Sequence, residues 1–289
     1  MNIKLITDST CCIPKEVLDK EKIAYLESQL IIDKKEYRDL SDLDYEEVIQ
    51  SLQFLEPYPK SSLASPQDAY KLFEQAQKEG YKEILYIGLS PNVSNQFNSA
   101  KVAAKRFKNK IKITLYQSGL MGPSQGAMVW NALKLLKDGK TVEEITAYLD
   151  TIKDQVYTVG LSADFNTLFR TGKIKKGVGI TVIASVLSLK PLFEINLDQG
   201  VVGIGGGVGY RGAIKKVLKN ISIHRRAELE YDLYISDAIA PRKLIFEIVQ
   251  KVKHNFPIKD IHYWRISPVV AWALGKGSVM ITIAPTMMS

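Results

Sequence analysis

Short apolar runs and helically spaced apolar residues alternate along the first half of the chain. Residues 84–87 form an apolar run without a polar gap, as in a strand that is buried on both faces of a parallel sheet. From Phe97 to Phe107, apolar residues recur at helical spacing. A polar loop that contains Ser94 and Asn95 separates the two stretches. The pattern therefore predicts a strand, a loop and a helix in this order.

The same order recurs elsewhere in the first half. Ser65 before Pro66 is typical of a helix start, and Thr141 with Glu144 forms a capping box at another. Further strands are predicted at residues 3–6, 30–32 and 112–116. Strands that alternate with helices favour a parallel sheet with right-handed crossovers.

The pattern changes after about residue 155. Two apolar runs, at residues 192–195 and 201–204, flank a turn sequence and predict an antiparallel hairpin. Ahead of the hairpin we expect a short helix, a basic loop and an apolar helix, at residues 164–169, 170–176 and 180–187. We therefore predict an α/β fold with two domains, a parallel-sheet N-terminal domain at residues 1–155 and an α+β C-terminal domain at residues 156–289.

Composition indicates a globular protein that stays in the cytoplasm. The chain has 289 residues, of which 46% are hydrophobic and 24% are charged, so it can form a substantial core. The uncharged apolar stretch at residues 177–189 is shorter than the roughly 20 residues of a membrane span. Cys11 and Cys12 are adjacent and suit a reducing compartment, where we expect two small buried residues. We expect cytoplasmic localisation and no stable membrane insertion.

The spacing of the candidate residues argues against most catalytic sites and against a nucleic-acid-binding site. The net charge is +8, but the lysines are spread over many helix faces, so we expect no nucleic-acid partner. The three histidines lack metal-ligand spacing, and we expect no metal site. The GxGxxG match at residues 207–212 follows a hairpin rather than the first strand, which favours a close-packed loop over a dinucleotide site. No nucleophile, base and oxyanion hole assemble, so we expect neither an enzyme nor a cofactor.

Hydroxyl and amide side chains gather in loops at predicted strand ends. Thr10 follows the first strand, and Ser94 and Asn95 follow the strand at residues 84–87. Ser61 and Ser62 are predicted to lie in the loop before the helix that starts at Ser65. Open α/β sheets bind ligands at such ends, where helix N-termini attract anions. The alternative is that Ser94 only caps its own helix.

Six segments in order resemble the DegV proteins, bacterial fatty-acid-binding proteins that in some species present a fatty acid to a fatty acid kinase. The resemblance covers nearly the whole chain and rests on DSTCCIP, KSSLASPQD, LSPNVSNQFNSA, LFRTGKI, LSLKPLFEI and ISPVVAWALGKG. It implies a two-domain α/β fold, with the acyl chain in a buried tunnel to which the C-terminal domain contributes. The fatty-acid carboxylate would be held by loop hydroxyls, which map onto Ser61 and Ser94.

The resemblance also implies a partner site. This chain departs from the family pattern at several positions. Arg170 matches an arginine that kinase-linked members use toward their partner. Ala273 stands where the family often has a head-group histidine, and Gln117 where it usually has aspartate. Thr171 and Lys173 replace glycine and arginine in the basic loop.

A fatty acid also suits the site on physical grounds. Loops with hydroxyls but without a base, a nucleophile or a phosphate cradle can hold an anion without transforming it. We therefore expect a long-chain fatty acid as the ligand and a fatty acid kinase as a partner. Two other classes remain open: an enzyme that acts on a small carboxylated or phosphorylated substrate in the same cleft, and an interaction module that uses the basic loop.

Overall fold

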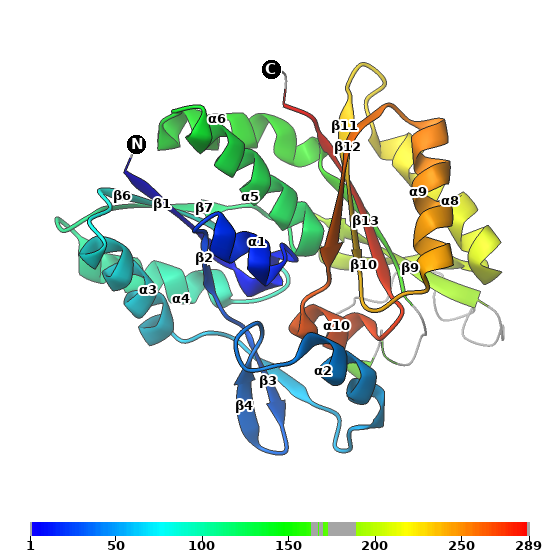
Figure 1. Cartoon of the computed structure of the whole chain (residues 1–289), viewed down its shortest axis with the longest axis horizontal. Helices are drawn as coiled ribbons and strands as arrows, with labels where there is room; N and C mark the ends of the chain where they lie inside the picture. The colour runs from blue at the N-terminus through cyan, green and yellow to red at the C-terminus, as the bar shows by residue number, and fades with distance from the viewer. Residues whose placement is uncertain (1, 163–166, 168–169, 173–188, 288–289) are drawn as a thin grey trace.

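A computed structural model describes residues 2–162, 167, 170–172 and 189–287, whose strands form three sheets (Figure 1). The first sheet is parallel and has the order β2, β1, β6 and β7. Its strands in that order span Ala24–Leu26, Ile3–Asp8, Glu83–Gly88 and Lys112–Gln117. The parallel sheet predicted for the first half of the chain is confirmed.

Helices cover both faces of this sheet. This is shown by the residues along β6, which alternate between two hydrophobic clusters. Tyr86 packs in one cluster with Phe73 and Phe107, whereas Ile87 packs in the other with Met128. The helices are α1 (Lys15–Lys20), α3 (Pro66–Lys78), α4 (Gln96–Ala104), α5 (Gly122–Lys137) and α6 (Val142–Ile152). Short 3-10 helices lie at Ser9–Cys11, Leu52–Phe54, Lys105–Phe107 and Lys153–Gln155. Both α3 and α6 begin with a capping box, which confirms the predicted helix start at Ser65 and the predicted capping box of Thr141 with Glu144.

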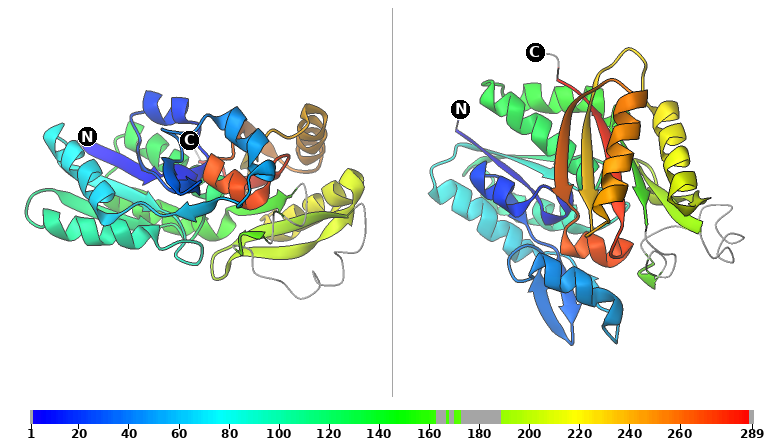
Figure 2. Two further views of the ribbon diagram at one scale, coloured as in Figure 1. Left: turned by 90° about the horizontal axis from the view of Figure 1, so that it is seen from below. Right: turned by 45° about the vertical axis from the view of Figure 1, so that its right-hand side comes forward.

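A small antiparallel sheet, β4–β3–β5, projects from the body of the protein and is called the arm below (Figures 1 and 2). Its strands are β4 (Lys35–Arg38), β3 (Gln29–Ile32) and β5 (Lys60–Ser62), and helix α2 (Tyr45–Ser51) follows β4. Asp33 and Lys34 both have positive φ and form the tight β3–β4 turn.

The arm corrects two expectations. Ser61 and Ser62 are predicted in a loop, but they belong to strand β5 and pair with β3. The strand predicted at residues 30–32 joins the arm rather than the parallel sheet. Glu27 and Ser28 alone separate β2 from β3, which is too short for a crossover back into a parallel sheet.

The second half forms a mixed sheet with the order β10, β9, β8, β13, β11 and β12. These strands span Gly200–Val208, Leu189–Asn196, Tyr157–Leu161, Val279–Pro285, Tyr231–Asp237 and Ile258–Arg265. The predicted hairpin is confirmed as the antiparallel pair β9 and β10. Helices α8 (Gly209–His224) and α9 (Arg242–Asn255) cover one face, as Figure 2 shows, and α10 (Pro268–Leu274) follows β12.

The glycine-rich stretch at residues 207–212 is a close-packed junction of β10 and α8. A Cβ atom on Gly207 would lie 2.2 Å from the backbone nitrogen of Ala213, so only glycine allows this approach. The stretch is close-packed, as predicted, but the predicted loop is wrong, because Val208 ends β10 and Gly209 begins α8.

Helix α5 lies between the parallel and the mixed sheets and joins them in one hydrophobic cluster (Figure 1). That cluster includes Met128 of α5, Leu85 of β6 and Tyr234 of β11. Cys11 and Cys12 are free thiols buried in the same cluster, as expected. The division into domains at residues 1–155 and 156–289 stays a prediction: the strands of the two large sheets divide there, but the core does not.

Three predicted features fall outside the described residues: the helix at 180–187, most of the helix at 164–169, and Lys173 with the lysines that follow it. Among the helices that the structure does describe, none has both the length and the apolar character needed to span a bilayer.

Candidate functional site

A cavity lies beyond the carboxyl ends of β1 and β6, between the arm and the mixed sheet. Its lining comes from the loops after both strands, from β5, from β10 and from helix α10. The apolar lining residues are Leu63, Leu89, Val93, Met121, Val201, Val269, Val270, Trp272, Ala273 and Leu274. The polar ones are Thr10, Ser28, Ser61, Ser62 and Ser94. The described lining thus has hydroxyl groups and no charged group.

The structure brings four of the five predicted ligand-binding residues to this cavity. Thr10, Ser61, Ser62 and Ser94 come from three different segments of the chain, and all of them line it. Asn95 does not line the cavity: its side chain is exposed, and its backbone forms the N-cap of α4. We therefore leave Asn95 out of the site.

Thr10 places an unpaired hydroxyl at the cavity. Its side chain is only 5% exposed, and its Oγ1 atom has no hydrogen-bond partner among the described residues. Buried polar groups are nearly always paired, so an unpaired hydroxyl at a cavity wall indicates a missing partner. A ligand with a polar end would supply that partner.

Ser94 has two roles open to it. Its Oγ accepts a long hydrogen bond of 3.3 Å from the backbone N–H of Gln96, in the first turn of α4. Ser94 therefore satisfies one of the free backbone N–H groups at the start of α4, in line with the capping alternative. It lies one residue before the N-cap. That bond uses only one lone pair of the oxygen, and the hydroxyl proton is still free to donate into the cavity.

The sequence did not single out Ser28, which lines the cavity beside these residues. It is 7% exposed, and its Oγ donates to the side-chain oxygen of Gln96 at 2.9 Å. Its backbone N–H donates to the hydroxyl of Ser9 at 3.1 Å. The available signal was its position two residues after the end of strand β2, since polar residues at the ends of parallel strands gather at one edge.

Asp8 forms a fully paired polar centre behind the cavity wall. Its carboxylate accepts from Tyr86 OH at 2.6 Å, Gln96 Nε2 at 2.7 Å, Leu89 N at 2.8 Å and Gln125 Nε2 at 3.0 Å. Burial raises the pKa of Asp8, and the four donors act in the opposite direction. Because every contact is a donor, we take the group to be an ionised carboxylate.

Asp39 is a second buried carboxyl group, and its backbone N–H donates to the carbonyl of Ser28 at 2.9 Å. It accepts from Ser9 Oγ at 2.7 Å and from the backbone N–H of Val269 at 2.8 Å, at the start of α10. Burial raises the pKa of Asp39 to about 6. Asp39 thus ties the segment after β4 to the helix that supplies one wall of the cavity.

The far end of α10 is tied to the segment that leads into β5. Trp272 Nε1 donates to the carbonyl of Pro59 at 2.6 Å, and Tyr58 OH donates to the carbonyl of Trp272 at 2.7 Å. Arg170 lies over the Tyr58 ring at 4.2 Å and pairs with Glu56 at 2.6 Å. The predicted partner residue Arg170 is therefore exposed and lies against this rim, outside the cavity lining.

The chemistry of the described lining is that of a binding site. Hydroxyl groups supply hydrogen bonds, and none of the described lining residues is a general base or a cation. Across the ranges that the structure describes, no group of histidine, cysteine or acidic residues is arranged to hold a metal ion.

Fold and site define a three-sheet α/β protein with a mostly apolar cavity whose lining also carries hydroxyl groups. The chain belongs to the DegV family, whose profile, described as "Uncharacterised protein, DegV family", matches residues 2–286. A DegV domain-containing protein of Clostridium acetobutylicum is 31% identical over 284 residues, which cover 97% of this chain and 98% of that protein. Another from Listeria innocua is 26% identical over 284 residues, with 97% of each chain covered.

Solved structures share this fold. A DegV lipid binding protein from Thermotoga maritima matches with a TM-score of 0.89 and 18% identity, covering 100% of both chains. A structure described as fatty acid binding of a DegV family protein from Thermus thermophilus matches with a TM-score of 0.87 and 21% identity, covering 99% of this chain and 100% of that one. The predicted α/β fold class and the predicted family are therefore confirmed.

Proposed function

We propose that this protein binds one long-chain fatty acid, with its carboxyl group against the hydroxyl groups of the cavity lining. The observation that carries the proposal is the buried, unpaired hydroxyl of Thr10, which lines a mostly apolar cavity together with Ser61 and Ser94. A carboxyl group can accept hydrogen bonds from all three. An acyl chain can occupy the apolar remainder.

The relatives support a fatty acid over other amphiphiles. The Thermus thermophilus protein is described as binding fatty acid, and so is a DegV family protein from Streptococcus agalactiae, which matches with a TM-score of 0.83 and 24% identity. A Eubacterium eligens relative is described as loaded with heptadecanoic acid. We extend this ligand class to the present chain because its cavity has the matching polarity.

Burial of the acyl chain supplies most of the affinity in this proposal. Each buried methylene contributes about 0.8 kcal/mol, so roughly 15 of them contribute on the order of 12 kcal/mol before the costs of association. The described residues bound a cavity of about 130 Å³, whereas ligand pockets usually measure roughly 300–1,000 Å³. We assign this part to the head group and the first methylenes, and the rest of the tunnel to residues 156–289.

Extraction of the purified protein tests the ligand class. Organic extraction followed by mass spectrometry should yield close to one long-chain fatty acid per chain. The matched control is Ala273→Trp, which fills the cavity from α10 and should carry much less fatty acid at equal purity. A polar phosphorylated or carboxylated metabolite in place of the lipid would favour the enzyme alternative, and no bound small molecule at all would contradict the proposal.

We further propose that a fatty acid kinase receives the bound ligand at the rim marked by Arg170. An exposed guanidinium beside the cavity can pair with phosphate oxygens in two parallel hydrogen bonds. In the free protein Glu56 and Tyr58 hold this side chain against the rim. A kinase would have to displace Glu56 to use it.

Arg170→Ala separates ligand binding from delivery. We expect unchanged fatty-acid affinity, because Arg170 is outside the described lining, and at least tenfold slower phosphorylation by a cognate kinase. Arg106→Ala is a matched control, since Arg106 also lies over a tyrosine ring, at 5.5 Å from Tyr70. Equal turnover by the wild type and Arg170→Ala would remove Arg170 from the partner site.

A further inference from the structure

The amide group of Gln96 has only one orientation that satisfies its neighbours. One of its terminal atoms contacts two acceptors, the Asp8 carboxylate at 2.7 Å and the Leu26 carbonyl at 3.1 Å. That atom must be the nitrogen, because only an N–H can donate to both. The other terminal atom accepts from the backbone N–H of Ala64 at 3.2 Å and must be the oxygen.

This orientation determines what Ser28 can offer to the cavity. The Ser28 hydroxyl contacts the Gln96 oxygen, which is an acceptor, so the single hydroxyl proton of Ser28 is committed to Gln96. Ser28 therefore presents only lone pairs to a ligand. Thr10 differs, because its hydroxyl has no partner among the described residues and can donate.

The charges around Ser28 are negative. The side chain of Gln96, to which Ser28 donates, donates in turn to Asp8. The hydroxyl of Ser9, which accepts from the backbone N–H of Ser28, donates to Asp39. Neither carboxyl group forms a salt bridge among the described residues. A second anion placed against Ser28 would meet lone pairs directly and two buried carboxyl groups just behind them.

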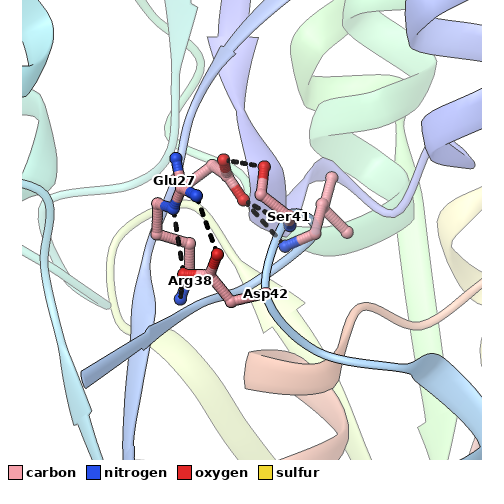
Figure 3. A network of polar contacts seen from close by, with 5 residues as sticks. Glu27, Arg38, Ser41 and Asp42 are labelled. Atoms are coloured by element: carbon pink, nitrogen blue, oxygen red, sulfur yellow. Dashed lines mark hydrogen bonds and ion pairs between the residues drawn. The ribbon is translucent and has the colours of Figure 1, made fainter. Parts of the chain in front are cut away.

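Neighbouring charged side chains are occupied by other partners (Figure 3). Arg38 pairs with Asp42 through Nε at 2.9 Å and through Nη2 at 2.7 Å. Glu27, next to Ser28, accepts from the backbone N–H groups of Leu40 at 2.8 Å and Ser41 at 2.9 Å. Lys60 at the start of β5 is exposed to solvent. Lys60 does not line the cavity, and none of the described lining residues is a cation.

We propose that Ser28 selects the neutral, protonated form of the fatty acid by accepting a hydrogen bond from its carboxylic O–H. The carbonyl oxygen of the acid then accepts from Thr10, Ser61 or Ser94. Those donors alone would favour an ionised head group, but the acceptor at Ser28 and the buried carboxyl groups behind it favour the neutral acid. This inference rests on the proposed function and specifies the form in which the ligand is held.

NMR of a bound fatty acid labelled with ¹³C at its carboxyl carbon tests this directly, since the chemical shift distinguishes the acid from its anion. We expect the wild-type complex to show the protonated shift at pH 7, with a midpoint about four units or more above the roughly 4.3 of an ordinary side-chain carboxyl. A bound signal with the ionised shift at pH 7 would overturn the inference while leaving the proposed function intact. No bound signal at all would overturn the proposed function instead.

Ser28→Ala tests which residue is responsible. The bound acid should lose its acceptor, and its midpoint should fall by at least one pH unit. Ser51→Ala, which removes a hydroxyl on α2 that donates to the carbonyl of Val48, should leave the midpoint unchanged. A midpoint that stays in place in a folded Ser28→Ala complex would contradict the role of Ser28. If that variant does not fold, the wild-type spectrum still decides the protonation state.

Calorimetry gives a second readout on the unmodified protein. Binding of the neutral form near pH 7.5 requires uptake of close to one proton per ligand, which appears as a dependence of the binding enthalpy on the ionisation enthalpy of the buffer. Uptake near zero would contradict the inference.

Discussion

The polar residues behind the cavity and those that line it differ in how completely they are paired. Asp8 accepts four hydrogen bonds, and the Gln96 side chain makes contacts at both of its terminal atoms. At the lining, Thr10 Oγ1 has no partner in the described part of the chain, and Ser94 accepts one long bond. Asp8 and Gln96 are therefore paired without a ligand, whereas Thr10 has no partner in that part of the chain and Ser94 keeps a free hydroxyl proton.

This difference separates the residues that hold the fold from those that await a ligand. A paired buried group stabilises the folded chain, and its removal leaves several buried groups with one hydrogen bond fewer. An unpaired group costs stability until a ligand arrives. Substitutions behind the wall should therefore change the free energy of unfolding, and substitutions in the lining should change affinity.

Asp8→Ala should have the largest effect. It removes an acceptor from four buried donors and leaves Tyr86 OH and the backbone N–H of Leu89 without one, so we expect a loss of about 3–5 kcal/mol in the free energy of unfolding. Denaturant unfolding measures this loss. Asp198→Ala, at the exposed tip of the β9–β10 hairpin, should change it by less than about 0.5 kcal/mol. Similar values for both variants would remove the distinction between the paired group and the surface.

Asp39 should make stability depend on pH. Its pKa is raised to about 6 from 3.8, so the folded state binds the proton more tightly than the unfolded state. The free energy of unfolding should therefore fall as pH rises from about 4 to 6, by roughly 3 kcal/mol at 1.36 kcal/mol per unit. Asp39→Asn should lack this fall, and matching pH profiles for the two proteins would contradict the assignment.

Ser94→Ala should act mainly on affinity. One hydrogen bond to the head group is worth roughly 1.5–3 kcal/mol if charged and about 1 kcal/mol if neutral, so we expect fatty-acid binding to weaken about five- to a hundredfold. Stability should fall by no more than about 1 kcal/mol from the lost contact with the helix start. Titration of delipidated protein measures the affinity, with Ser51→Ala as the control. Unchanged affinity in Ser94→Ala would leave Ser94 with the helix-start role only.

Thr10→Val should give the smallest effect and the most specific one. Valine has the shape of threonine without the unpaired hydroxyl, so the ligand-free protein should gain about 1 kcal/mol in stability. Fatty-acid binding should weaken about tenfold, because the head group loses one donor. A loss of stability in the ligand-free variant would mean that Thr10 is paired in the free protein.

Sequence patterns predicted the scaffold because its signals are local. The capping boxes at Ser65 and Thr141 and the buried run that became β6 each depend on neighbouring residues. Thr10 and Ser94 were found because strand ends in a parallel sheet meet at one edge. Asn95 was included for its residue type, yet it faces solvent one position beyond Ser94.

Features that depend on distant contacts were missed. The arm brings Ser61 next to Leu30 of β3, a pairing that no local pattern in a short polar segment indicates. Ser28 and Asp39 reach the site through Gln96, Ser9 and Val269, which lie on segments far apart in the sequence. Their roles depend on which atom donates and which accepts each hydrogen bond. This can be read only from the three-dimensional structure.

A crystal structure of the protein as isolated tests the central claim most directly. The account predicts density for one acyl chain, with a carboxyl oxygen within about 3 Å of the hydroxyl oxygens of Thr10, Ser61 or Ser94. Those hydroxyls unpaired beside an empty or water-filled cavity, or a fatty acid whose head group lies elsewhere, would contradict it.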